Sequence, residues 1–114
     1  MLEPRRPQRF NFSAPLQIQW GSTVVSACVS DVSVNGLFIR TPDPFWLGAM
    51  FSADLLLDPS LQICCTVCRV DPGRGMGVRI AFANKEDSFR YGELVEKVMQ
   101  DELSHDSNLP KEST

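Results

Sequence analysis

The sequence predicts a mainly β fold: a six-stranded antiparallel barrel of the split or Greek-key kind, followed by one C-terminal α-helix. The first observation is a series of six short strand-like segments, separated by turns rich in glycine, proline, asparagine and aspartate. The second is a change to helical periodicity after residue 83. The third is size, because 114 residues that are 43% apolar suffice for one compact domain and are too few for two.

The first half of the chain contains three of the predicted strands. Residues 10–20 place apolar or small side chains at alternate positions, which is the period of a strand. Residues 23–32 are β-branched and small, as suits the partner strand of a hairpin. Asn35 and Gly36 predict a tight turn before residues 37–41, since both residue types tolerate a positive φ.

Three further strands follow, each bounded by turns that contain proline or glycine: residues 49–57, 61–70 and 76–82. The large aromatic residues Trp20, Phe45 and Trp46 could stack on a base, but such side chains more often fill a core or cover the end of a barrel. We therefore assign them no role in binding.

One amphipathic helix is predicted to close the domain over residues 84–103. Asn84 can cap its first turn, and Asp87 three residues later can complete the set of acceptors there. Apolar side chains at helical spacing form one face: Tyr91, Leu94, Val95, Val98 and Met99. Residues 104–114 are polar and contain a proline, so we expect a disordered tail.

The charge is unevenly distributed along the chain. The net charge is -3, of which residues from 84 onward contribute four basic against eight acidic side chains, or -4, so the remainder carries +1. A nucleic-acid surface usually has a basic face and a high pI, whereas the pI here is about 5.0. We therefore expect no DNA or RNA partner. Three arginines near the start predict a local anion clamp instead: Arg5, Arg6 and Arg9.

No membrane segment is expected, because no run of about 20 apolar residues is present and the first residues are polar. We expect a cytoplasmic protein. Its cysteines fit a reducing compartment as small buried hydrophobes. On a strand over residues 61–70, Cys64 and Cys68 would face one way and Cys65 the other, so the C-x-x-C pair could not hold one metal ion.

Catalysis has little support in the sequence. The only histidine, His105, lies in the predicted tail, where it cannot serve as a base for a serine or cysteine nucleophile. No phosphate-binding glycine loop, dinucleotide fingerprint or metal-ligand spacing is present. The sequence therefore predicts a binding protein without an enzymatic activity and without a cofactor.

Two polar motifs flank the first predicted hairpin: R-x-x-x-R near the start and D-x-S-x-x-G after it. Each is weak alone, because arginine pairs are common on surfaces and Asp, Ser and Gly often stabilise turns. Together they are complementary to a guanine nucleotide. Arginines can grip phosphates and the O6/N7 edge of guanine, while a carboxylate and a hydroxyl accept from the N1 and N2 hydrogens.

The two motifs, in this order and across one hairpin, resemble the PilZ domain, the bacterial receptor module for cyclic di-GMP. The resemblance covers roughly residues 3–82, and residues 75–82 are similar to the closing strand of that family. It implies that residues 10–83 form the barrel and that residues 1–10 form a flexible arm that closes over the ligand. The ligand-binding residues that it implies are Arg5, Arg9, Asp31, Ser33 and Gly36.

Further arginines could extend this set. Arg6 lies inside the spacer and is either a third phosphate contact or merely solvated. Similar domains often supply one more arginine to the second guanine from the last strands. Among Arg69, Arg74 and Arg79, we prefer Arg79 for this role.

The resemblance implies a cyclic di-GMP receptor that passes its signal to a protein partner when the arm becomes ordered, in pathways such as motility and surface attachment. The alternative is a ligand-independent adaptor of the PilZ type that acts through protein contacts in pilus or motility assembly. Such divergent members typically lack the binding motifs, and this chain has both, which favours the receptor. The partner, the affinity, the number of ligands bound and the oligomeric state, monomer or homodimer, stay open.

Overall fold

The structure is a computed structural model that describes residues 8–107, with side chains to residue 102. Six antiparallel strands form a closed barrel in the order β1-β2-β3-β6-β5-β4, and one helix follows them, as the sequence predicts. The elements are β1 (Phe10–Trp20), β2 (Thr23–Val32), β3 (Gly36–Arg40), β4 (Met50–Leu55), β5 (Leu61–Asp71), β6 (Gly75–Ala81) and α1 (Lys85–Ser107).

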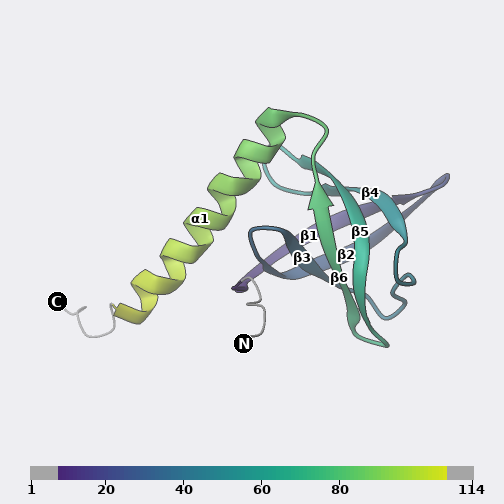
Figure 1. The fold of residues 1–114 in the computed structure, drawn as a ribbon, viewed down its shortest axis with the longest axis horizontal. Helices are drawn as coiled ribbons and strands as arrows, with labels where there is room; N and C mark the ends of the chain where they lie inside the picture. Colours follow the sequence, from purple (N-terminus) through teal and green to yellow (C-terminus); the bar gives the residue numbers. More distant parts are fainter. Residues whose placement is uncertain (1–7, 108–114) are drawn as a thin grey trace, which may run out of the picture.

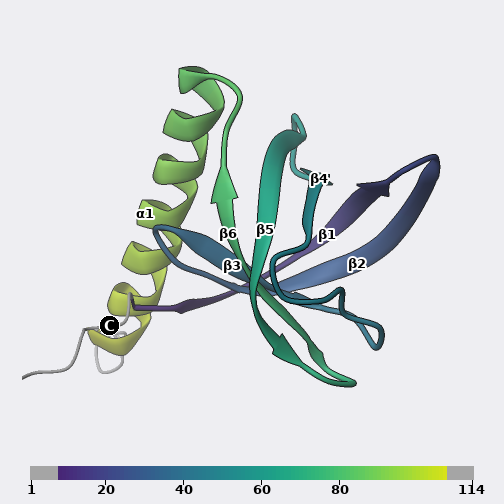
Figure 2. The ribbon, with the colours of Figure 1, turned by 45° about the vertical axis from the view of Figure 1, so that its right-hand side comes forward.

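The helix lies along one side of the barrel. Figures 1 and 2 show the long β1–β2 hairpin projecting away from α1, whereas the start of β1 passes close to the C-terminal half of the helix. The strands close around an apolar interior because their alternate side chains point inward. The largest fully buried side chains include Leu16, Ile18, Leu37, Ile39, Leu55, Leu61 and Ile63.

Two β-bulges change which side chains reach the outer surface. On β2, the pairing with β3 shifts between Val29 and Asp31, so Ser30 is an extra residue. Val29 is 1% exposed and Val32 is 0% exposed, and the bulge accommodates two outward residues, Ser30 and Asp31, between them. Without the extra residue, strict alternation would point Asp31 into the core and Val32 toward solvent.

The second bulge lies on β5, where the pairing with β6 shifts between Val67 and Arg69. Val67 is buried in the core, and the two residues that follow it, Cys68 and Arg69, are both exposed. The bulge therefore presents Arg69 on the outer face of the barrel.

The helix begins at a side-chain cap that was predicted from the sequence. The Asp87 backbone N–H donates to Asn84 Oδ1 at 2.8 Å, and Asn84 Nδ2 lies 3.4 Å from Asp87 Oδ2. The predicted apolar face packs against the barrel core, where Tyr91, Val95 and Val98 are buried. The helix extends past the predicted end at residue 103 and reaches Ser107.

Two expectations about particular residues need correction. Only Cys65 is buried, whereas Cys28, Cys64 and Cys68 are exposed, so three of the four cysteines are not core residues; the predicted alternation of Cys64 and Cys65 is confirmed. Within the described residues, neither Asn35 nor Gly36 has a positive φ. A positive φ is therefore not what requires a glycine at position 36.

The three aromatic residues Trp20, Phe45 and Trp46 pack against one another. The rings of Trp20 and Phe45 are 4.5 Å apart between centroids, and Trp46 packs edge-on against Trp20 at 5.4 Å.

Within residues 8–107, the one helix is too polar to cross a membrane.

Candidate functional site

An ion pair joins the two sequence motifs. Arg9 Nη1 lies 3.2 Å from Asp31 Oδ1, and their side chains are 40% and 25% exposed. The other carboxylate oxygen accepts from the hydroxyl of Ser30 at 3.3 Å. β1 and β2 pair at Asn11 and Asp31, which places the residues just before β1 beside the carboxylate. The structure thus brings the second arginine of R-x-x-x-R to the aspartate of D-x-S-x-x-G.

The turn that follows β2 is held by hydrogen bonds within the motif itself. We call residues 33–36 the recognition turn. The Ser33 backbone N–H donates to the Gly36 carbonyl at 2.8 Å, and Ser33 Oγ donates to the same oxygen at 3.3 Å. Ser33 is buried, at 7% exposure, although its side chain is polar. Its hydroxyl oxygen still has acceptor capacity, since donating uses only the hydrogen.

Gly36 is required by crowding. Gly36 pairs with Arg79 across β3 and β6, and a Cβ built on Gly36 would overlap the carbonyl oxygen of Val78. Only a residue without a side chain lets β3 approach β6 this closely. The glycine of the motif therefore allows the close pairing of β3 with β6 at the recognition turn.

A cavity of about 420 Å³ lies beside the recognition turn, and we call it the turn cavity. Its lining includes every predicted site residue that the structure describes: Arg9, Asp31, Ser33, Gly36 and Arg79. Arg5 and Arg6 lie outside the described residues. The lining also includes Arg69, so three guanidinium groups and one carboxylate surround a single opening.

A row of paired residues crosses four strands at this place. Asp31 on β2 pairs with Phe38 on β3, Phe38 pairs with Gly77 on β6, and Gly77 pairs with Arg69 on β5. Both bulges end at this row, which explains why its charged members face outward. The sequence motifs do not reveal the row, because its members come from four segments that only the barrel topology aligns.

Phe38 lies on the outer face of the barrel and is nevertheless buried. A Cβ at Gly75 would meet its ring, and a Cβ at Gly77 would lie 3.9 Å from it, so the ring occupies space that these glycines leave free. The Arg69 guanidinium covers it at 5.5 Å from the ring centroid. Sequence reasoning ranked Arg69 below Arg79, and its position over an aromatic ring was not visible from spacing.

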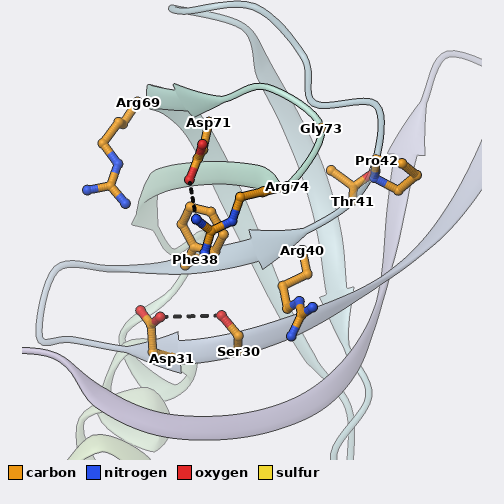
Figure 3. Close-up of a pocket in the computed structure, with 10 residues that line it drawn as sticks. All are labelled: Ser30, Asp31, Phe38, Arg40, Thr41, Pro42, Arg69, Asp71, Gly73 and Arg74. Carbon is orange, nitrogen blue, oxygen red and sulfur yellow. Dashed lines mark hydrogen bonds and ion pairs between the residues drawn. The ribbon is translucent and has the colours of Figure 1, made fainter.

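A second opening adjoins the first and shares Asp31 and Arg69 with it. We call this second opening the hairpin cavity, because it extends toward the turn between β5 and β6; its volume is about 470 Å³. Figure 3 shows Arg69 and Asp31 on either side of the strand that carries Phe38, with Arg40 and Arg74 farther along. Arg74 lies 3.7 Å from Asp71 and is 77% exposed. Together the two cavities form an elongated, arginine-rich surface.

This surface offers many hydrogen-bond donors and a few acceptors. Guanidinium groups suit phosphate oxygens and flat π systems, and the carboxylate of Asp31 suits N–H donors. Among the described residues, no group of three or more His, Cys, Asp or Glu side chains is arranged to hold a metal ion. The arrangement is suited to binding an anionic ligand with polar ring edges.

The fold and the site define a small β-barrel domain with one C-terminal helix. The PilZ domain model matches residues 3–100, and the chain belongs to the PilZ domain family. No curated protein matches the sequence.

Three solved structures have a similar fold. The PilZ domain of CeSA from a cellulose-synthesizing bacterium is 22% identical, with a TM-score of 0.62 over 81% of this chain and 98% of that chain. The Bacillus subtilis inhibitor of motility, MotI, is 17% identical, with a TM-score of 0.70 over 90% of this chain and 53% of that chain. K. pneumonia MrkH, in complex with c-di-GMP, is 14% identical, with a TM-score of 0.70 over 89% and 55%. The chain thus spans about half the length of MotI and MrkH.

Proposed function

We propose that this protein is a receptor for cyclic di-GMP and binds the dinucleotide on the outer face of the barrel, between the N-terminal arm and the recognition turn. The observation that carries the proposal is the contact of Arg9 with Asp31 at a cavity that Ser33 and Gly36 also line. A guanidinium and a carboxylate side by side supply donors for phosphate and acceptors for guanine. Membership of the PilZ family and the fold shared with the c-di-GMP-bound MrkH support it.

Each side chain has a role that follows from its chemistry. Asp31 accepts from N1 and N2 of one guanine, and Ser33 Oγ offers a further acceptor beside it. Arg9 leaves the carboxylate and binds phosphate or the O6/N7 edge of guanine. Arg5 acts with it from the arm, and Arg6 is a third phosphate contact or is solvated.

The second guanine lies toward β5 and β6. Arg79 and Arg69 line the turn cavity, and either guanidinium can fork onto a base or stack on its plane. Arg69 already lies over the ring of Phe38, and this contact reduces the side-chain entropy that Arg69 loses on binding a base.

Opening the Arg9–Asp31 pair costs little. Exposed ion pairs of this kind contribute about 0–1 kcal/mol, because water solvates both charges and two long side chains lose freedom. Arg9 can therefore exchange this contact readily for contacts with the ligand.

The protein binds its ligand without chemical turnover and acts in the cytoplasm. Closure of the arm over the ligand changes the surface that a protein partner meets, and in this way the signal leaves the domain.

Isothermal titration with cyclic di-GMP tests the proposal, with cyclic di-AMP and GTP as comparison ligands. We expect guanine-selective binding, because adenine lacks the N2 donor and the O6 acceptor. Arg9→Ala and Asp31→Ala should each weaken binding by about 1–3 kcal/mol. Lys85→Ala is the matched control, since it removes one exposed charge at the start of α1, outside both cavities.

The outcomes separate the two functions. Selective binding that is weakened in Arg9→Ala and Asp31→Ala and unchanged in Lys85→Ala supports the receptor. If the unaltered protein gives neither heat nor a thermal shift with cyclic di-GMP, the receptor is excluded and the adaptor is the remaining function. Equal affinity in all three variants would place the ligand elsewhere on the domain.

A further inference from the structure

The helix is hydrogen-bonded directly to the recognition turn. The hydroxyl of Tyr91, on α1, lies 2.8 Å from the Ser33 carbonyl oxygen and 2.9 Å from the Gly36 carbonyl oxygen. A phenol has one hydrogen to donate, so the two carbonyls share it. Tyr91 is 2% exposed, and its ring packs at 5.5 Å from that of Phe82. Neither carbonyl belongs to the helix, and each lies more than 50 residues away in the sequence.

The recognition turn depends on this hydroxyl for one of its hydrogen bonds. Opposed residues in an antiparallel hairpin can exchange two backbone bonds. Within the described residues, Ser33 N–H donates to the Gly36 carbonyl, but no return bond from Gly36 N–H to the Ser33 carbonyl is formed. Tyr91 supplies the donor that this carbonyl would otherwise lack, and a buried carbonyl without a donor is costly.

The hydroxyl keeps its hydrogen across the ordinary pH range. Burial raises the pKa of Tyr91 far above its usual value, and the charge of Arg9 opposes this shift only in part. Tyr91 is therefore a permanent donor to the turn.

The same helix also contacts the other motif-bearing segment. Glu102 accepts from the backbone N–H of Asn11 at 3.0 Å, and Asn11 follows Arg9 by two residues. The helix is thus bonded to both segments that carry the motifs: to the recognition turn through Tyr91 and to the base of the arm through Glu102. No sequence motif marks this link, because Tyr91 is part of an ordinary apolar helix face.

We propose that Tyr91 is a positioning residue, which fixes the recognition turn in the geometry that binds the ligand and couples the occupancy of the turn to the attachment of α1. This proposal rests on the proposed function for its ligand. Coupling between two sites is reciprocal, so a ligand that prefers the anchored turn also tightens the attachment of the helix. The N-terminal half of α1 is then the first part of the protein to register binding beyond the cavity.

Tyr91→Phe tests the proposal, because it keeps the ring and removes only the hydroxyl. Isothermal titration should show cyclic di-GMP affinity falling by roughly 3–10-fold, the effect of about one hydrogen bond. Val98→Ala is the control, since it shortens another buried side chain of α1, which lies two helical turns past Tyr91, beside Asn11 and Phe12, and does not line the turn cavity. A merely structural role would make both variants behave alike, so equal affinities in the two variants would overturn the proposal.

Amide hydrogen exchange supplies a readout that needs no ligand. The N–H of Ser33 should exchange faster in Tyr91→Phe than in Val98→Ala, because only the first variant loosens the turn. Ligand should slow exchange around Tyr91 in the unaltered protein and not in Tyr91→Phe. If the unaltered protein binds no cyclic di-GMP, the proposed function fails, and faster turn exchange confined to Tyr91→Phe still establishes the anchor. If the Ser33 N–H exchanges in Tyr91→Phe as slowly as in the unaltered protein, Tyr91 does not anchor the turn.

Discussion

The glycines of the site differ in the space around them. A Cβ at Gly36 would overlap the carbonyl of Val78, whereas a Cβ at Gly77 would meet its nearest neighbours, Arg69 and Arg9, at 3.5 and 3.8 Å, which is ordinary contact. The sequence identified Gly36 as a special position but predicted the wrong cause, a positive φ. Turn composition is a local property, whereas crowding by a strand more than 40 residues away is not.

Gly36→Ala should therefore destabilise the fold, while Gly77→Ala should not. We expect Gly36→Ala to lower the free energy of unfolding by about 1–3 kcal/mol, because the methyl group forces two paired strands apart. Gly77→Ala should change the free energy of unfolding by less than about 1 kcal/mol, since its methyl group is accommodated and the unfolded chain becomes less flexible. Urea unfolding of both variants measures the difference. Similar losses in the two variants would contradict the crowding explanation.

At the scale of elements, hydrophobic patterning predicted the strands and the helix but not the bulges. Alternation along residues 23–32 and 61–70 indicates strands, yet nothing in a local pattern fixes where an extra residue will be accommodated. The bulges at Ser30 and Cys68 depend on how the neighbouring strands pair, and they decide that Asp31 and Arg69 face the same cavity. This is why the motif residues could be predicted and the row across four strands could not.

The helix boundary was more predictable, because its signal is local. Asn84 caps α1 through the Asp87 N–H. Asn84→Ala should cost about 1 kcal/mol of stability, and Asn84→Ser, which keeps an acceptor, should recover most of it. Thermal unfolding followed by circular dichroism checks both variants. A loss in Asn84→Ser as large as in Asn84→Ala would mean that the cap does not depend on this acceptor.

At the scale of the whole molecule, the closed barrel encloses one cysteine and leaves the others outside. Cys65 is buried, and burial, with a smaller effect from Cys64, raises its pKa to about 12 from an ordinary value of 9.0. A thiol reacts as its thiolate, so Cys65 is protected both by access and by protonation. The unfolded chain ionises this thiol first as the pH rises above 9.0, and the folded state consequently loses stability there.

A thiol-specific reagent should therefore label only the exposed cysteines of the folded protein. At mildly alkaline pH, we expect three thiols to react in the native protein, Cys28, Cys64 and Cys68, and the fourth only in denaturant. A Cys65→Ala variant provides the control, because its count should be three in both conditions. Rapid labelling of a fourth thiol in the native protein would indicate that the barrel opens at this strand.

The closure of the sheet also restricts how a partner can recognise this domain. Within the described residues, each of the six strands has a hydrogen-bonded neighbour on both sides. A partner that adds a strand of its own, a mode of recognition that relies mainly on backbone and tolerates many sequences, therefore finds little free strand edge. Residues 23–27 of β2, on the projecting hairpin, pair with β1 alone and offer such an edge. Elsewhere on the barrel and on α1, a partner must recognise side chains. Single surface substitutions should accordingly be able to separate one partner from another while leaving the fold intact.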